Sequence, residues 1–464
     1  MRLGARLLLP AAGLGLGIVA TEGMAQAASS AAVSVRDAAS GAAASALPSD
    51  ASAAPDARVA AQDHAHTPAA RRTGPAALAA PPGRTAAPAF HPRLPWDGRE
   101  AALALPEARL LLDRFWAAGP PVGRMIGVGG VPLAWRVFLQ PDRAAERGAV
   151  LIVSGRTETM AKYQETVWDL YQAGWSVYLY DHRGQGLSGR EPAVDREGRR
   201  QHGHVERFDD YVDDLRELVR TRLLPAGHRE LRLLAHSMGG AISARLLQQD
   251  TPEAAAFGAV ALLSPMMAIR GLGDATADGL LCGVARSADA LGLGARYIPG
   301  GGDWRERDFD GNRLTGSALR LERLHAVYRA QPEARLGSAT FGWTVQACAG
   351  ARAAREQAAR IRQPLLLAIG EGDRIVHPQG AQAFCAAWRA ADPQVRRCGG
   401  ADGGPWLLPD ARHELLIERD ALRTPVLQAV LRFFERPQLA LPAQELPTQE
   451  LPTQELPAHP RPAP

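Results

Sequence analysis

Hydrophobic and polar positions along the middle of the chain follow a pattern that is typical of strands separated by helices. Short runs of consecutive apolar residues, suited to buried parallel strands, are followed by segments with the 3.6-residue spacing of helices. The clearest apolar runs cover residues 149–153, 175–180, 231–235, 259–263 and 364–370. This order predicts a mainly parallel sheet covered by helices on both faces.

The two ends of the pattern predict the edges of the sheet. Residues 124–138 indicate two strands around a glycine turn, which is typical of an antiparallel edge. The helices and the last short strand expected elsewhere cover residues 208–224, 378–391, 406–408 and 414–434.

A serine at a strand-to-helix turn is the first candidate for chemistry. Residues 235–240 read Ala-His-Ser-Met-Gly-Gly directly after an apolar run. A backbone bent this sharply lifts the hydroxyl of Ser237 above the sheet, and it needs small residues two positions away, here Ala235 and Gly239. The N–H of Met238 then lies at a helix start, where the dipole favours a developing oxyanion. We therefore predict that Ser237 is a nucleophile rather than a simple helix cap.

The alternation of strands and helices stops between residues 266 and about 360. This segment mixes glycine-rich turns with helical pieces, and four aromatic residues predict an apolar surface on it: Trp304, Tyr328, Phe341 and Trp343. An insertion that follows the strand after Ser237 is where a lid over the site is expected. The sequence therefore predicts a helical lid over about residues 266–360.

Composition divides the 464 residues into one globular domain, 95–436, and two tails. Residues 28–94 are rich in Ala, Pro, Ser and Arg and have too little apolar bulk to offset the entropy of ordering, so we predict disorder. Residues 437–464 contain a repeat of Gln-Glu-Leu-Pro-Thr and predict a second disordered tail. Residues 1–27 combine arginines, an apolar run and a small-residue cleavage site, which is typical of a signal peptide.

The signal peptide predicts export to the periplasm or the medium, with an uncleaved membrane tether as the alternative. Four cysteines fit an exported protein with one or two disulfides, and they allow three connectivities: Cys282, Cys348, Cys385 and Cys398. A Cys385–Cys398 bridge is favoured because only a helix end and a short loop separate the two residues. Four buried free thiols are the alternative.

Charge and metal-ligand spacing exclude two classes of function. The formal net charge is +4, and the basic residues are scattered arginines with Lys162 as the only lysine. This gives no basic stripe along which nucleic acid would bind, and the arginine excess indicates coding bias. No cysteine and histidine cluster has the spacing of a zinc site.

Several further motifs accompany the serine turn. They are Gly-Arg-Thr-Glu at 155–158, Lys-Tyr at 162–163, Asp-His-Arg-Gly-Gln-Gly at 181–186 and the acidic helix start at 203–215. Together they resemble the serine α/β-hydrolases, and within them the lysophospholipase L2 and monoacylglycerol lipase group. The resemblance covers about residues 120–436 and neither tail. It implies an α/β-hydrolase fold with an inserted lid, a serine nucleophile, and no cofactor or metal.

Chain order in this fold then predicts the partners of Ser237. The acid follows a late strand and the histidine precedes the last helix, which selects Asp373 and His413. His413 would move the proton of Ser237, and Asp373 would hold the imidazole tautomer. Asp402 or Asp410 replaces Asp373 only if the late strands are placed wrongly.

Other polar residues near these motifs are interpreted as structural: His204, His236, His377 and the loop 181–189. An oxyanion hole needs two converging N–H groups. Met238 supplies one, and the resemblance places the other on Arg156, in the loop after the strand 149–153. The family often has His-Gly in this loop, whereas this chain has Ser154-Gly155.

These features predict a carboxylic-ester hydrolase that forms an acyl-enzyme on Ser237. The resemblance implies lysophospholipids as substrates, with monoacylglycerols or general carboxylic esters as alternatives. An acyl chain would lie against the lid, which would also allow peripheral contact with a membrane. A catalytically inactive lipid-binding protein with the same fold is the non-enzyme alternative. The sequence leaves the oligomeric state open.

Overall fold

The computed structural model describes residues 98–191, 198–270 and 279–437. The predicted signal peptide, the segment 28–94 and the tail after Pro437 lie outside these residues. Within the described ranges, no helix is long and apolar enough to span a bilayer.

An eight-stranded sheet forms the centre of the domain, in the order β1-β2-β4-β3-β5-β6-β7-β8. β1 and β2 run antiparallel to their neighbours and the other pairs are parallel, as the sequence predicted. The strands are β1 (Gly123–Ile126), β2 (Pro132–Phe138), β3 (Gly148–Val153), β4 (Trp175–Tyr180), β5 (Leu231–His236), β6 (Phe257–Leu263), β7 (Leu365–Gly370) and β8 (Trp406–Leu408).

The strand register places the carboxyl ends of the central strands side by side at one edge of the sheet. Val153 at the end of β3 pairs with Ala235 of β5, and Leu263 at the end of β6 pairs with His236 and with Ala368. Ligands and catalytic groups of open α/β sheets gather at this edge. The residues that follow β3, β5 and β7 are therefore the ones to examine.

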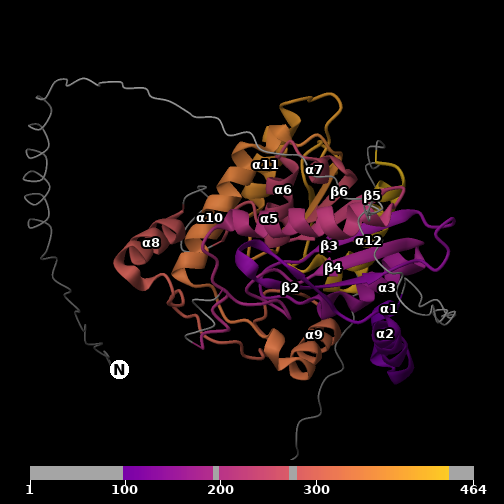
Figure 1. Cartoon of the computed structure of the whole chain (residues 1–464), viewed down its shortest axis with the longest axis horizontal. Helices are drawn as coiled ribbons and strands as arrows, with labels where there is room; N and C mark the ends of the chain where they lie inside the picture. The colour runs from indigo at the N-terminus through magenta and orange to yellow at the C-terminus, as the bar shows by residue number, and fades with distance from the viewer. Residues whose placement is uncertain (1–97, 192–197, 271–278, 438–464) are drawn as a thin grey trace, which may run out of the picture. The chain divides into compact units, whose positions relative to one another are not determined.

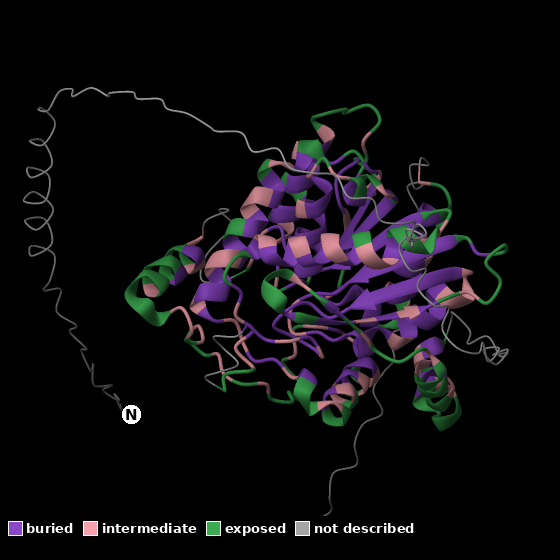
Figure 2. Cartoon of the chain, in the orientation of Figure 1, coloured by how far each residue is buried: buried purple, intermediate pink, exposed green. Residues whose placement is uncertain are grey.

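Helices cover both faces of the sheet (Figure 1). One face packs against α5 (Phe208–Leu218), α6 (Met238–Leu247), α10 (Phe341–Glu356) and α11 (Pro378–Arg389). The other packs against α1 (Arg99–Ala104), α2 (Pro106–Ala118), α3 (Gln164–Gln172) and α12 (Asp420–Glu435). The central strands are buried along their length, because they are apolar on both faces (Figure 2).

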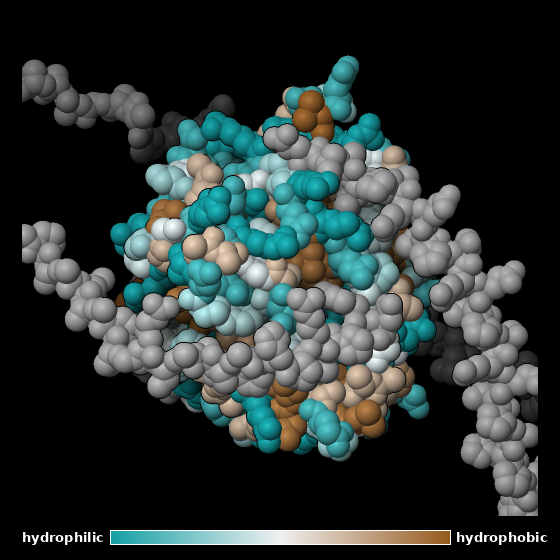
Figure 3. All heavy atoms as spheres, turned by 90° about the vertical axis from the view of Figure 1, so that its right-hand side faces the viewer, coloured by the Kyte–Doolittle hydropathy of each residue, from teal (hydrophilic) through white to brown (hydrophobic). Residues whose placement is uncertain are grey.

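The surface is more polar than the buried strands. The face at the right of Figure 1 carries hydrophilic residues with apolar ones scattered among them (Figure 3). Singly exposed apolar side chains of this kind are normal for a folded domain.

The last helix begins later than the sequence predicted. Helical periodicity suggested a start at 414, but α12 begins at Asp420 after a short 3₁₀ turn, Leu415–Ile417. Glu418 interrupts the helix because its backbone is extended, with φ −75° and ψ 174°. Its carboxylate accepts the N–H groups of Gly316, Arg412 and Arg419, which holds the chain in this turn.

The segment 266–360 contains α8 (Leu280–Ala288), α9 (Ala318–Ala330) and α10. The expectation that Tyr328 and Trp343 form an apolar surface was wrong, because both side chains are buried. Trp343 belongs to the main core, and α10 packs so closely on α5 that a Cβ on Gly350 would overlap the Phe208 ring. α10 is therefore part of the domain's core layer.

Both pairs of cysteines are bridged. Cys385–Cys398, the favoured pair, is present, and Cys282–Cys348 forms a second bridge that ties α8 to α10. Within the described residues no cysteine is left free.

Candidate active site

Ser237 occupies the turn between β5 and α6, and its backbone is strained. Its φ of 51° and ψ of −119° lie where residues other than glycine rarely occur. The turn is tight: a Cβ on Gly239 would lie 2.3 Å from the carbonyl oxygen of Val153. This is the geometry of a nucleophile elbow, in which the serine hydroxyl points away from the packed core.

His413 and Asp373 complete a chain of hydrogen bonds from Ser237. The Nε2 atom of His413 lies 3.0 Å from the Ser237 Oγ, and its Nδ1 lies 2.7 Å from Oδ2 of Asp373. A carboxylate only accepts, so Nδ1 carries the proton and Nε2 is free to accept the serine proton. The structure thus brings together the three residues that chain order selected.

Asp373 is fully buried at the turn after β7. Its Oδ1 accepts the N–H groups of Ile375 and Val376, which fixes the carboxylate. Burial alone would raise the pKa of Asp373, but His413 and these two N–H groups outweigh burial and lower it. Asp402 and Asp410, the alternatives, are not the residues that contact the imidazole Nδ1.

The loop after β3 lies directly against the nucleophile. A Cβ on Gly155 would lie 3.0 Å from the Ser237 Cβ, so only glycine leaves room here. In the described structure the N–H groups of Arg156 and Met238 donate to no other residue. Residues 154–158, called the oxyanion loop below, therefore have the position that the second donor of an oxyanion hole requires.

Three buried side chains hold the oxyanion loop. Glu158 accepts the N–H of Gly155 at 2.9 Å, His182 bonds the carbonyl of Ser154 at 2.8 Å, and Gln185 donates to the carbonyl of Gly155 at 2.7 Å. Burial lowers the pKa of His182 to about 4, so the ring is neutral and donates from Nε2.

The side chain of Arg156 connects the oxyanion loop to the inserted segment. Its guanidinium stacks over Trp343 at 4.5 Å and donates to the carbonyls of Gly337 and Ser338. Burial lowers the pKa of Arg156 to about 10, which leaves the group cationic at neutral pH.

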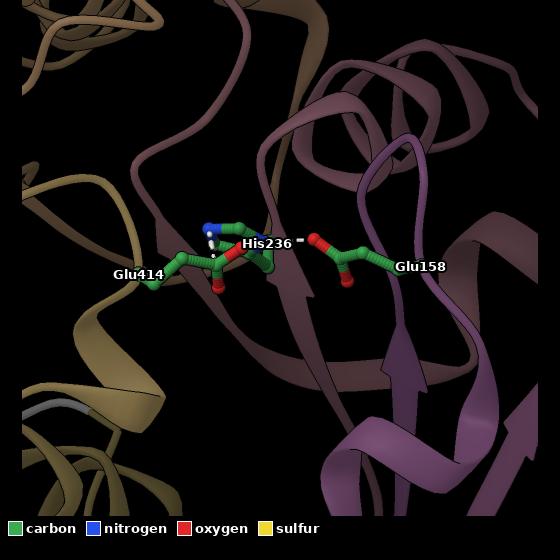
Figure 4. A group of neighbouring side chains, drawn as sticks. All are labelled: Glu158, His236 and Glu414. Carbon is green, nitrogen blue, oxygen red and sulfur yellow. Dashed lines mark hydrogen bonds and ion pairs between the residues drawn. The ribbon is translucent and has the colours of Figure 1, made fainter. Parts of the chain in front are cut away.

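A cluster of buried charged residues adjoins the site, because His236 directly precedes Ser237 and Glu414 directly follows His413 in the chain; Figure 4 shows the cluster itself. Glu158, His236 and Glu414 approach one another closely enough for their side chains to share a cation. That position is taken: the Lys162 Nζ lies 3.0 Å from Glu158 Oε1 and also contacts Glu414. The cluster is therefore filled by the protein's own ammonium group, and it offers no place for a metal ion.

The sequence missed the residues of this cluster as contributors to the site. His236 was interpreted as structural, and Glu158 and Lys162 only as motif positions. One signal was present, because Lys162 is the only lysine among the 53 lysine and arginine residues. His377, also interpreted as structural, accepts the Gln379 N–H as the N-cap of α11.

Comparisons with known proteins agree with this geometry. A family model described as serine aminopeptidase, S33 matches residues 144–420. The chain is 33% identical over 351 residues to lysophospholipase L2 of Escherichia coli (strain K12), covering 75% of this chain and 96% of that protein. It is 30% identical over 314 residues to the probable lysophospholipase L2 of Haemophilus influenzae, covering 68% and 91%.

A solved structure supports the fold alone. A soluble variant of monoglyceride lipase from Saccharomyces cerevisiae, in complex with a substrate analogue, matches with a TM-score of 0.52 and 17% identity over 69% of this chain and 96% of that one. The strained serine, the contacts of His413 and the matched family model all indicate a serine hydrolase. The chain therefore belongs to the serine aminopeptidase S33 family of α/β-hydrolases and groups there with lysophospholipase L2.

Proposed function

We propose that this serine ester hydrolase cleaves the fatty acyl ester of lysophospholipids through an acyl-enzyme on Ser237. The observation that carries the proposal is the unbroken series of contacts from Ser237 through His413 to Asp373. Similarity to lysophospholipase L2 along 96% of that protein supports the substrate class.

In the first half-reaction the Ser237 Oγ attacks the acyl carbonyl while His413 Nε2 takes its proton. Asp373 stabilises the imidazolium that forms. The carbonyl oxygen becomes an oxyanion and accepts the N–H groups of Met238 and Arg156. His413 then gives its proton to the glycerol oxygen, so that the ester C–O bond breaks and the acyl group stays on Ser237.

In the second half-reaction water replaces the alcohol. His413 takes a proton from the water, whose oxygen attacks the acyl carbon and forms a second oxyanion. The bond to Ser237 breaks, the serine oxygen recovers its proton from His413, and a free fatty acid leaves. Every proton is moved by one imidazole.

The decisive experiment is Ser237→Ala in the full chain. Release of fatty acid from lysophosphatidylcholine should fall by on the order of 10³ or more, with an unchanged thermal melting curve. Monoacylglycerol, diacyl phospholipid and p-nitrophenyl butyrate run in parallel define the preferred ester. Retained hydrolysis in the variant would exclude Ser237. A wild-type protein that neither hydrolyses these esters nor reacts with a fluorophosphonate probe would instead be catalytically inactive, and lipid binding would then be measured separately.

We also propose that the inserted segment contacts a lipid surface. Leu280 and Val284, 63% and 40% exposed, are four residues apart on α8, and Leu291, 78% exposed, lies in the π-helical turn that follows, Asp289–Leu293. Replacing Leu280 and Leu291 with serine should reduce sedimentation with phospholipid vesicles and leave hydrolysis of p-nitrophenyl butyrate unchanged. Unchanged sedimentation would refute membrane contact at this face.

Export, with residues 1–27 as the signal peptide, is a further proposal. Its support is the pair of disulfides, which form and persist in oxidising compartments. Fractionation of cells that express the full chain should recover a mature protein beginning near residue 28 outside the cytoplasm. An intact N-terminus in the membrane fraction would favour a tether instead.

A further inference from the structure

The charged cluster that adjoins the site joins segments that are far apart in the chain. Lys162 lies at the start of the helical region after β3, whereas Glu414 is 252 residues further on. The side chains of Lys162, Glu158 and Glu414 are 2%, 5% and 6% exposed, so their charges interact with little screening by water. The lysine ammonium contacts both carboxylates, and His236 also lies 2.8 Å from Glu158 and 3.6 Å from Glu414.

Each carboxylate is attached to a different part of the catalytic machinery. Glu158 holds the oxyanion loop through the N–H of Gly155. Glu414 directly follows His413 in the chain. Because Lys162 binds both carboxylates, it fixes the distance between the loop that would receive the oxyanion and the residue that would move the proton.

His236 ties the nucleophile to the same cluster. Its Nδ1 lies 2.8 Å from Glu158 and its Nε2 lies 3.2 Å from the carbonyl oxygen of His413. The rings of His236 and His413 are 4.8 Å apart. Since His236 directly precedes Ser237, all three parts of the site meet one buried network.

The charges in the cluster are compatible with a permanent ion pair. Burial lowers the pKa of Lys162, but Glu158 and Glu414 outweigh burial and raise it. Burial raises the pKa of Glu158, but Lys162 and His236 outweigh burial and hold it well below its usual range. Lys162 and Glu158 are therefore both charged at neutral pH.

The choice of residue also argues for a specific role. The chain uses arginine at every other basic position, yet it has a lysine here. A lysine ammonium is a compact charge with three rotatable donors, whereas a guanidinium is larger and planar. In this cluster the compact ammonium contacts both Glu158 and Glu414.

We propose that Lys162 is a positioning residue that keeps the oxyanion loop and His413 in register by bridging Glu158 and Glu414. It touches no reacting atom, and it acts through these two partners. The inference rests on the proposed ester hydrolysis at Ser237. Loss of the bridge should lower kcat, because small errors of placement weaken contacts that form only in the transition state, while ground-state binding of the ester is unaffected.

The test compares Lys162→Met with a control from another buried ion-pair site. Arg99 is the matched control, because its buried guanidinium lies 2.9 Å from Asp169 and 3.7 Å from Glu165, and none of these residues contacts Ser237, His413 or the oxyanion loop. On p-nitrophenyl butyrate, Lys162→Met should lower kcat by roughly 10- to 100-fold with KM within about threefold. Arg99→Met should lower the melting temperature and leave kcat within about twofold.

A double variant keeps the test informative if Lys162→Met does not fold. Lys162→Met with Glu414→Gln removes one cation and one carboxylate together, so the net charge of the buried cluster does not change. It should be folded by circular dichroism and show the same loss of kcat and a similarly slow reaction with a fluorophosphonate. A kcat within twofold of wild type in the folded double variant, or an equal loss in Arg99→Met, would overturn the proposal. Because the butyrate ester and the probe report on Ser237 directly, a failure to cleave lysophospholipid would count against the proposed substrate and not against this role of Lys162.

Discussion

At the scale of single residues, Asp373 is the member of the site whose role is most sharply testable. Asp373→Asn keeps the size of the side chain but can donate a hydrogen bond to Nδ1, which favours the wrong tautomer of His413. We expect kcat to fall by roughly 10² to 10⁴ with KM nearly unchanged. Steady-state kinetics on p-nitrophenyl butyrate measure both. A comparable loss in Asp402→Asn would contradict the assignment.

His182 predicts a pH dependence of stability. Its folded pKa of about 4 lies below the ordinary value of 6.5, so between these values the folded protein binds fewer protons than the unfolded chain. This contribution to the free energy of unfolding is present above pH 6.5, and it is lost as the pH falls toward 4. The shift corresponds to roughly 3 kcal/mol at most.

The variant His182→Gln removes the titration and keeps a donor for the carbonyl of Ser154. Urea unfolding at pH 7, 6, 5 and 4 should show a smaller loss of stability in the variant than in the wild type. Identical pH slopes in the two proteins would mean that His182 is not the group responsible.

The residues that could be predicted from sequence are those that chain order identifies. Ser237, Asp373 and His413 each follow a recognisable strand, and a parallel sheet brings the ends of its strands to one edge. Glu158, Lys162 and Glu414 could not be placed in the same way. Glu158 and Lys162 are only four residues apart, but the contact of Lys162 with Glu414 depends on side-chain packing between segments 252 residues apart, which local periodicity cannot predict.

At the scale of elements, strands were predicted more accurately than the segment that packs on them. The apolar runs of β3 to β7 are buried on both faces, so their pattern is continuous and has clear ends. α10 has a weaker pattern because small residues, Ala347, Ala351 and Ala354, make its contact with the core. Its role in the core was therefore missed, and its tryptophan was interpreted as lid surface.

This correction changes the expected effect of Trp343→Ala. Because the indole is buried in the main core and stacks against Arg156, its removal should cost about 3 to 5 kcal/mol of stability. Activity on butyrate and on long-chain esters should then fall together as the protein unfolds. Phe341→Ala, at the partly exposed start of α10, is the control and should be milder. A folded Trp343→Ala with a selective loss on long chains would restore the acyl-binding interpretation.

At the scale of the whole molecule, two disulfides constrain the domain in unequal ways. Cys282–Cys348 closes a loop of 66 residues that includes α8 and α9, whereas Cys385–Cys398 closes one of only 13 residues. The candidate catalytic residues Ser237, Asp373 and His413 lie outside both loops. The bridges should therefore affect global stability more than the chemistry at the site.

The length of the closed loop predicts which disulfide contributes more to the stability of the folded domain. A cross-link removes conformational entropy from the unfolded chain, by roughly 4 kcal/mol for a loop of 66 residues and roughly 3 kcal/mol for one of 13 at 25 °C. Replacing Cys282 and Cys348 with alanine should thus lower the melting temperature more than replacing Cys385 and Cys398. At 25 °C, kcat on p-nitrophenyl butyrate should stay within about twofold of wild type in both variants. Dithiothreitol reduces both bridges, so it should lower the melting temperature of the wild type below that of either double alanine variant. If the variant without the shorter bridge melts first, native packing around Cys385 and Cys398, and not loop entropy, governs the stability of this domain.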